Sequence, residues 1–315
     1  METEDRTPII KTLTDNLVNE MLLAFGLGNR ALNWQALRHV MGVPASRFVH
    51  YIDQFDQLIF KDGLPAASRW IASQFFRSVN VRGRQTLPES GPVLVASNHP
   101  GALDSVSILG SLPRNDIQIF TSSSPFFRNI PAAQGRCIFV ENPKSVEERM
   151  STILQGIEHL KQGGMVVIFP TGLVDPEPAF REGSKETMQK WSRSLELMLR
   201  KVPQTRLALT VTSDVLMEKY SRHPLTLMQK QAWRRQRMAE YLQVIHLLLS
   251  KKVLPLDTHI SFSQPITAEQ LSTGNGSGRM IDEIIRREQA LFDEHMNARA
   301  NGFTASEKLF TSETA

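Results

Sequence analysis

Residues 93–104 join a short apolar run to a polar turn and read Val93-Leu94-Val95-Ala96-Ser97-Asn98-His99-Pro100-Gly101-Ala102-Leu103-Asp104. The run Val93–Ala96 is predicted to be a strand. Pro100 suits the first position of a helix, because proline lacks the N–H group that is unpaired there anyway. His99 would then stand just outside the helix, with its ring free to point into a cleft. The stretch therefore predicts a strand followed by a helix, with a histidine in the turn between them.

Similar apolar runs recur along the chain and alternate with helical patterns. The runs are Val93–Ala96, Ile117–Phe120, Cys137–Val140, Met165–Phe169, Leu207–Thr212 and Thr258–Phe262. The helical patterns are Val146–Gln162, capped by Ser145 and Glu148, and Lys185–Arg200, Leu225–Lys251 and Met280–Ala298. Strands that alternate with helices need crossover connections. The fold class is therefore α/β, with a mixed, largely parallel sheet covered by helices on both faces.

The N-terminal part of the chain has a different pattern. Its apolar residues recur at helical intervals over residues 9–80, with no extended β-branched run. Four residues predict breaks between about four short helices, namely Gly26, Gly28, Gly63 and Pro65. We therefore expect a helical N-terminal subdomain over residues 1–80, the strand-containing domain over 81–265, and a C-terminal helix and tail over 266–315. The last dozen residues are expected to be frayed.

Composition restricts the class of protein. The chain has 315 residues, 36 Lys+Arg against 32 Asp+Glu, a formal net charge of +4, and 41% hydrophobic residues. This usage is typical of a folded protein and excludes a disordered chain, a collagen and a long coiled coil. The single cysteine, Cys137, permits no intramolecular disulfide and no cysteine-based zinc site, which indicates a cytoplasmic location. We expect neither a membrane-spanning helix nor a secretory signal.

His99 and Asp104 are the residues that point to catalysis. Two residues at this spacing within one helix lie about 140° apart, but a histidine in the preceding turn can fold back onto the aspartate. The carboxylate would then fix the imidazole tautomer, so that the histidine takes a proton from a hydroxyl as a general base. No Gly-x-Ser-x-Gly motif supplies a nucleophile, and Ser97 is the weaker alternative. The same spacing also occurs where a histidine merely caps a helix.

A second candidate site lies at the end of the strand Met165–Phe169. The chain continues as Pro170-Thr171-Gly172, and backbone N–H groups in such a turn can face a phosphate or a developing oxyanion. A structural turn has the same pattern. Because ligand sites gather at the ends of parallel strands, the turn becomes a candidate together with His99.

The two motifs together resemble blocks I and III of the phospholipid and glycerol acyltransferase superfamily, of the glycerol-3-phosphate and 1-acylglycerol-3-phosphate acyltransferase type. The resemblance covers residues 81–262, which makes residues 81–265 the expected acyltransferase domain. It implies transfer of a fatty acyl group from acyl-CoA or acyl carrier protein to a hydroxyl of lysophosphatidate, glycerol 3-phosphate or a similar acceptor, without a metal or bound cofactor. In this resemblance His99 is the base and Asp104 orients it. The residues implied around the acceptor are Asn98, Phe169, Pro170, Thr171 and Gly172.

Two positions depart from the family pattern. Thr171 stands where many members have glutamate, and Asn142 stands where the second block has a phosphate-binding arginine. Arginine offers a charged bidentate fork for phosphate, whereas asparagine offers one neutral amide. Arg136, Lys144 and Arg181 are candidates to replace the arginine, although each can equally be a solvated surface cation. An acceptor with a different head group is therefore an alternative.

The most basic segment covers residues 219–237. It holds six cations and no carboxylate, namely Lys219, Arg222, Lys230, Arg234, Arg235 and Arg237. Apolar residues recur there at helical spacing, so we expect an amphipathic helix that exposes its cations beside Trp233. Such a helix suits anionic lipid, acyl carrier protein or the phosphates of coenzyme A, and equally an ordinary solvated face. We expect peripheral contact with the inner face of a membrane, and no nucleic-acid partner.

Two other functions fit the same residues. A protein that kept the fold could bind lipid at a membrane surface without catalysis, and a hydrolase could let water replace the acceptor alcohol. The intact pair of His99 and Asp104 favours catalysis over binding alone.

Overall fold

The computed structural model describes residues 5–25, 34–141, 146–250, 252–272, 279–304 and 306–311. These residues form one eight-stranded sheet with the strand order β4-β3-β5-β2-β6-β7-β1-β8. The strands are β1 (Phe76–Arg82), β2 (Val93–Ser97), β3 (Ile117–Ser122), β4 (Cys137–Val140), β5 (Met165–Ile168), β6 (Arg206–Ser213), β7 (Leu254–Phe262) and β8 (Glu307–Thr311). Neighbours from β4 to β6 are parallel, as are β7 and β1, whereas β6 with β7 and β1 with β8 are antiparallel. The predicted mixed, largely parallel sheet is confirmed.

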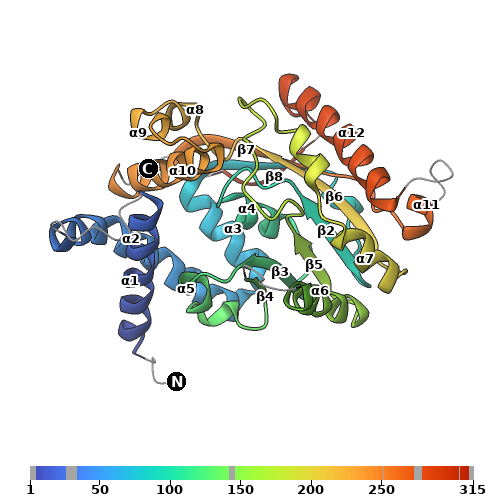
Figure 1. Cartoon of the computed structure of the whole chain (residues 1–315), viewed down its shortest axis with the longest axis horizontal. Coiled ribbons are helices and arrows are strands. Elements are labelled where there is room, and N and C mark those ends of the chain that lie inside the picture. Colours follow the sequence, from blue (N-terminus) through green and yellow to red (C-terminus); the bar gives the residue numbers. More distant parts are fainter. Residues whose placement is uncertain are drawn as a thin grey trace.

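Helices cover both faces of the sheet (Figure 1). They are α1 (Thr7–Ala24), α2 (Trp34–Asp62), α3 (Leu64–Phe75), α4 (Asp104–Ser111), α5 (Pro125–Arg128), α6 (Val146–Lys161), α7 (Ser194–Lys201), α8 (Glu218–Ser221), α9 (Pro224–Leu227), α10 (Ala232–Ser250), α11 (Ala268–Ser272) and α12 (Met280–Ala300). The short 3₁₀ turns are η1 (Arg84–Thr86), η2 (Pro131–Ala133) and η3 (Glu186–Lys190). No helix among the described residues is long and apolar enough to cross a lipid bilayer.

The strand β2 explains why both faces are covered. Val93 and Val95 belong to a core that includes side chains of α1, α2, α3, α4 and α10. Leu94 and Ala96 belong to a second core that includes side chains of α6, α7 and α12. Because successive side chains of a strand point to opposite faces, a run of four apolar residues needs a layer of helices on each side.

The N-terminal helices differ from the prediction of about four short ones. The described residues form three helices there, and α2 alone has 29 residues with Pro44 inside it. The apolar stripe of α2 continues past this proline, and Val49, Ile52 and Ile59 are buried in the core, so packing maintains the helix. Gly63 does separate α2 from α3, and its positive φ of 86° is a conformation that glycine adopts without steric cost. Gly26 and Gly28 lie outside the described residues.

Two strands were not predicted from the sequence. β1 and β8 each mix polar with apolar residues, so neither contains an apolar run. β1 pairs with β7 on one side and with β8 on the other, so the expectation that the last dozen residues are frayed is wrong for Glu307–Thr311. Main-chain N–H and C=O groups along the edge of β1 pair with Glu307–Thr311 and hold this segment in the sheet. β1 also spans the boundary predicted between residues 80 and 81. The tail that follows α12 adds a strand to the same sheet.

Two predicted helices are each divided in the structure. The segment predicted as Lys185–Arg200 consists of η3 and α7, and the segment predicted as Leu225–Lys251 contains α9 and α10. Leu225 and Leu249 follow the helical spacing of apolar residues that predicts a buried stripe, yet both are exposed. The inner face of α10 is partly polar instead, since Gln236 and Gln243 are buried there. The helix predicted at Met280 is confirmed as α12, whereas the Ser145 cap before α6 and the side chain of Trp233 lie outside the described part.

Candidate active site

The two predicted motifs meet at the carboxyl ends of neighbouring strands. β2 and β5 pair in parallel from Val93 with Met165 to Ala96 with Ile168, so the turns that follow them leave the sheet at the same edge. The rings of His99 and Phe169 stack there, with their centroids 4.2 Å apart and their planes 24° apart. Strand pairing therefore brings two segments together that are far apart in the sequence.

His99 and Asp104 form a hydrogen-bonded pair. Nδ1 of His99 lies 2.8 Å from Oδ2 and 3.1 Å from Oδ1 of Asp104. The Asp104 side chain is fully buried at the first residue of α4, whereas 22% of the His99 side chain is exposed. A carboxylate at Nδ1 favours the tautomer with its proton there, which leaves the lone pair of Nε2 available to take a proton.

Three carboxylates determine the proton affinity of His99. Burial alone would lower the pKa of His99, but the charge and hydrogen bond of Asp104, with the charges of Glu240 and Asp175, raise the pKa to about 8. The imidazolium form is therefore favoured at neutral pH, and the neutral form that acts as a base increases as the pH rises through 8.

The main chain of His99 is held by Asp175 in the loop after β5. The N–H of His99 donates to Oδ2 of Asp175 at 2.9 Å, and the N–H of Asp175 donates to the carbonyl oxygen of His99 at 2.7 Å. Thr171 Oγ1 lies 3.3 Å from the same carboxylate oxygen. Asp175 was not predicted from the sequence, because no motif or periodicity distinguishes it from other loop carboxylates.

α10 holds the next part of the turn. Nε2 of Gln236 donates to the carbonyl oxygen of Pro100 at 2.7 Å, and the N–H of Ala102 donates to Oε2 of Glu240 at 3.3 Å. These α10 residues were not predicted either, since the cations and apolar residues are the prominent pattern of this segment. Their spacing of four residues is the signal that could have shown one polar face.

Asn98 has a structural role instead of the predicted contact with substrate. Its side chain is 2% exposed. Its amide nitrogen donates to the carbonyl oxygen of Thr212 at 2.9 Å, and its amide oxygen accepts from the N–H of Thr212 at 2.8 Å. The side chain thus continues the contact between β2 and β6 beyond their last paired residues, Ser97 and Thr210. Ser97 is fully buried, which removes it as a nucleophile.

The turn after β5 is held mainly by its own hydrogen bonds. The N–H of Gly172 donates to the carbonyl oxygen of Phe169 at 3.0 Å, so it is not directed at a substrate as predicted. Gly172 has φ of 66°, a conformation that glycine adopts without steric cost. The hydroxyl of Thr171 donates to the carbonyl oxygen of Leu173 at 2.9 Å, and Pro170 is buried. Phe169 is the side chain of this turn that contacts the His99 ring.

The three candidate cations have different positions. Arg136 precedes β4, which is parallel to β3 and β5, so it lies at the amino edge of the sheet, opposite the edge that holds His99. Its Nη1 donates there to the carbonyl oxygen of Asn115 at 3.2 Å. The prediction that Arg136 binds substrate beside His99 is therefore wrong. Lys144 lies outside the described residues, as does Asn142.

Arg181 lies on the His99 side of the molecule. Its Nη2 donates to Oγ of Ser221 at 2.5 Å, and its Nε is buried without a hydrogen-bond partner within the described part of the chain. Burial lowers the pKa of Arg181, the charge of Arg235 lowers it further, and the charge of Glu240 opposes this shift. Arg181 therefore shares Glu240 as an electrostatic neighbour with His99.

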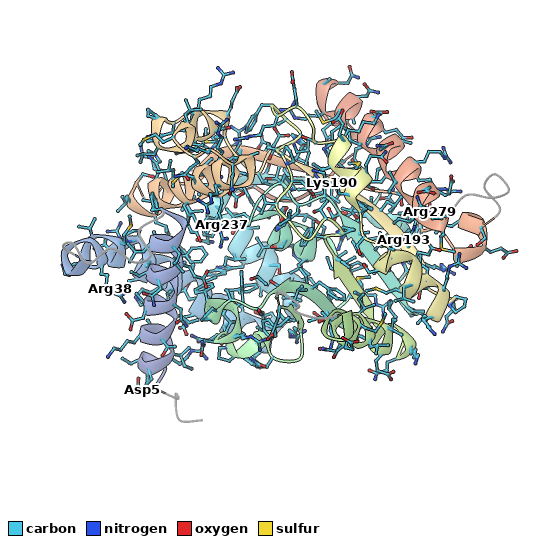
Figure 2. All side chains as sticks on the ribbon, viewed as in Figure 1. Asp5, Arg38, Lys190, Arg193, Arg237 and Arg279 are labelled. Carbon is cyan, nitrogen blue, oxygen red and sulfur yellow. The ribbon has the colours of Figure 1, made fainter. Side chains whose placement is uncertain are left out.

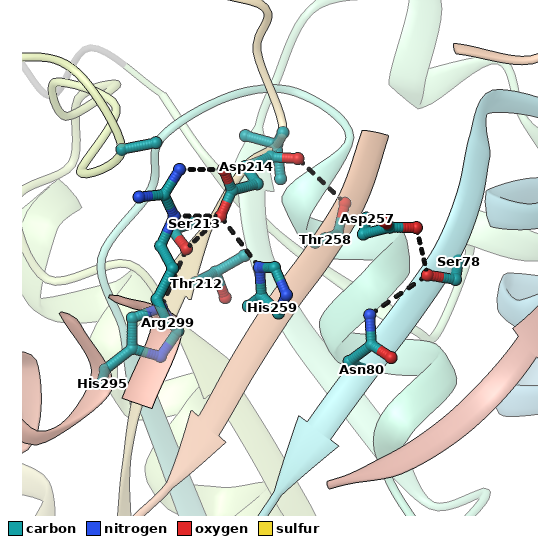
Figure 3. Close-up of polar contacts among 12 residues, drawn as sticks. Ser78, Asn80, Thr212, Ser213, Asp214, Asp257, Thr258, His259, His295 and Arg299 are labelled. Atoms are coloured by element: carbon teal, nitrogen blue, oxygen red, sulfur yellow. Dashed lines mark hydrogen bonds and ion pairs between the residues drawn. The ribbon is translucent and has the colours of Figure 1, made fainter. Parts of the chain in front are cut away.

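A separate polar cluster lies where β6 ends (Figure 3). Asp214 has φ of 61° and accepts from Arg299 at 2.7 and 2.8 Å, and its Oδ2 lies 2.9 Å from Nδ1 of His259. His295 lies between two hydroxyls, with Nε2 2.9 Å from Ser213 Oγ. These contacts join α12 to the sheet. Over the described ranges, no group of three or more His, Cys, Asp or Glu side chains has a geometry that could hold a metal ion.

This chain was compared with known protein families and solved structures. Residues 78–203, which contain both motifs, match the family model described as Acyltransferase. A solved structure described as the 1-acyl-sn-glycerophosphate (LPA) acyltransferase PlsC from Thermotoga maritima is similar, with a TM-score of 0.44 and 13% identity over 93% of this chain and 100% of that chain. No curated protein matches this chain.

Proposed function

We propose that this chain transfers a fatty acyl group from acyl-CoA or acyl carrier protein to a hydroxyl of a glycerophosphate-type acceptor, such as lysophosphatidate or glycerol 3-phosphate, because residues 78–203 match the family model described as Acyltransferase. The observation that carries this proposal is the pair of His99 and Asp104, with Nδ1 2.8 Å from Oδ2, at the carboxyl end of β2. The imidazole is partly exposed, whereas its carboxylate is buried.

The proposed reaction uses the lone pair of Nε2, the ring nitrogen of His99 that does not face Asp104. Neutral His99 takes the proton of the acceptor hydroxyl at Nε2 while the oxygen attacks the carbonyl carbon of the thioester. The resulting tetrahedral intermediate carries an oxyanion, and the imidazolium is stabilised by Asp104 at Nδ1. When the intermediate collapses, the C–S bond breaks and the thiolate takes the proton from Nε2. The products are the ester and the free thiol, and His99 returns to its neutral form.

We propose that Arg181 binds the phosphate group of the acceptor. Of the two candidate cations in the described ranges, only this one lies on the His99 side. Its guanidinium is half-buried and keeps one N–H group, at Nε, without a partner in the described part. A partly desolvated guanidinium is well suited to a phosphate monoester. This assignment supports a glycerophosphate acceptor although Thr171 and Asn142 replace the usual family residues.

We also propose that the chain works at a membrane surface. α9 and the residue that follows it expose the apolar side chains Leu225, Leu227 and Met228, and 76% of Met228 is exposed. Lys230, two residues after Met228, is also exposed. Apolar side chains beside cations are typical of proteins that bind anionic lipid surfaces peripherally. Sedimentation with anionic vesicles tests this, and Met228→Glu should reduce the bound fraction.

A thiol-release assay tests the proposed reaction. Long-chain acyl-CoA is combined with a panel of acceptors that includes lysophosphatidate, glycerol 3-phosphate and lysolipids with other head groups, and products are identified by mass spectrometry. We expect acceptor-dependent thiol release that His99→Ala abolishes, while His39→Ala, an exposed histidine on α2, keeps the wild-type rate. No thiol with any acceptor would instead mean a lipid-binding protein. Fatty acid release at the same rate without an acceptor would mean a hydrolase.

A further inference from the structure

Two carboxylates hold consecutive amides of the turn that carries His99. Asp104 accepts from the N–H of Gly101 at 3.2 Å, and Glu240 accepts from the N–H of Ala102 at 3.3 Å. Asp104 is the first residue of α4, the helix that follows this turn, whereas Glu240 comes from α10. α10 therefore contributes a second acidic side chain to the same short turn.

The other oxygen of Glu240 has no role in holding the fold. Oε1 is buried and has no hydrogen-bond partner in the described part of the chain. A Cβ atom placed on Gly101 would lie 3.6 Å from it, which locates Oε1 directly against the turn. Leaving a carboxylate oxygen buried and unpartnered has a free-energy cost. A nearby positive charge would offset that cost, and the imidazolium of His99 is such a charge.

The groups around His99 come from three elements. Asp104 faces it from α4, Asp175 from the loop after β5, and Glu240 from α10, and each raises the pKa of His99. The stacked ring of Phe169 carries no charge. Three carboxyl groups therefore surround one imidazole.

Glu240 has cations of its own nearby. Arg237, on α10 (Figure 2), and Arg181 both lie within electrostatic range of it. Burial raises the pKa of Glu240 to about 7, and the charge of His99 opposes this shift. The ionised forms of Glu240 and His99 therefore stabilise one another.

We propose that Glu240 is a positioning residue for acyl transfer, which holds the Ala102 amide and stabilises the positive charge that His99 gains when it takes the acceptor proton. The proposal rests on the proposed acyl transfer by His99. Asp104 orients the ring through Nδ1, whereas Glu240 acts through its charge and through the backbone of the turn.

The substitution Glu240→Gln separates the charge from the hydrogen bond. Its amide oxygen can still accept from Ala102, while the negative charge is lost. His99 should then lose its proton at lower pH and become a weaker base. Because the rate depends on base strength with a coefficient below one, the variant should be faster than wild type at low pH and slower at high pH.

The experiment measures kcat/KM against pH from about 6 to 10 for the wild type, Glu240→Gln, Glu240→Asp and Gln243→Met. Gln243 is the matched control, since it lies on the same inner face of α10 but bonds the main chain of Val215 and Met217. We expect Glu240→Gln to lower the midpoint and to reduce the plateau at high pH by about two- to threefold. Glu240→Asp should restore part of the wild-type midpoint. Gln243→Met should lower the melting temperature and leave the midpoint unchanged, and an unchanged midpoint in Glu240→Gln would overturn the proposal.

A second readout does not require activity. The rate at which diethyl pyrocarbonate modifies the His99 peptide, followed by mass spectrometry against pH, reports the pKa of His99 in the folded chain. Glu240→Gln should move this midpoint to lower pH. If Glu240→Gln shifts this midpoint but the wild-type chain transfers no acyl group, the proposed function is refuted and the effect of Glu240 on His99 remains. Normal acyl transfer with no shift would refute the role of Glu240 alone.

Discussion

The N–H of His99 donates to a carboxylate oxygen of Asp175 at 2.9 Å, and the N–H of Asp175 donates to the carbonyl oxygen of His99 at 2.7 Å. This pair joins the turn after β2 to the loop after β5. The position of the imidazole therefore depends on a residue far from it in the sequence.

The substitution Asp175→Ala should displace His99. It leaves the buried N–H of His99 without an acceptor, which typically costs about 1–3 kcal/mol. We expect the free energy of unfolding in urea to fall by about that amount, and kcat to fall by about tenfold or more because the base is misplaced. Asp175→Asn keeps an acceptor oxygen and should lose less of both. A normal kcat in Asp175→Ala would show that this link does not position the ring.

The substitution Asp104→Asn should separate catalysis from folding. An amide of the same size can still accept from Gly101, but it no longer favours the Nδ1–H tautomer of His99 or stabilises the imidazolium. We expect the circular dichroism spectrum to be retained and kcat to fall by about 10²- to 10⁴-fold. Wild-type turnover in this variant would refute the role given to Asp104.

Arg181 and Arg136 allow a matched comparison, because they lie at opposite edges of the sheet. Arg181→Gln removes the proposed partner of the acceptor phosphate and should raise KM for a phosphorylated acceptor by about tenfold, with a smaller change in kcat. Arg136→Gln makes the same change in charge and should leave both parameters as in wild type. Equal effects of the two substitutions would point to net charge and not to a phosphate site.

His295 should make stability depend on pH. Burial above all, with the charge of His259, lowers the pKa of His295 from 6.5 to about 3. Between these values the unfolded chain takes up a proton that the folded chain excludes, so folding becomes weaker as the pH falls, by up to about 1.4 kcal/mol per pH unit. Urea unfolding at several pH values should show a shallower loss for His295→Gln. A constant difference between the two proteins across this range would contradict the assignment.

The sequence predicts the parts of the fold in which apolar side chains determine the structure. β2 and β5 are buried on both faces and therefore appear as continuous apolar runs. The pairing of these two strands also brings His99 beside Phe169, as their shared sheet edge implies. β1 and β8 were missed because a strand near the edge of a sheet needs fewer apolar residues than a central one.

The missed parts of the site depend on contacts between side chains and backbone. Gln236 and Glu240 pack against the turn through hydrogen bonds, and such contacts leave no apolar periodicity. Asp175 is placed by the path of a loop that no local pattern encodes. The prediction for Arg136 was wrong for a different reason. Arg136 is near the second family block in the sequence, but it precedes the strand β4 and therefore lies at the amino edge of the sheet, opposite His99.

The pairing of β8 with β1 has a consequence for handling the protein. Glu307–Thr311 occupies one edge of the sheet and satisfies main-chain groups of β1. A chain shortened before Glu307 would expose those groups as a template for strand addition by a second molecule. Such a truncation should favour self-association and lower solubility, even though it removes no residue of the His99 site.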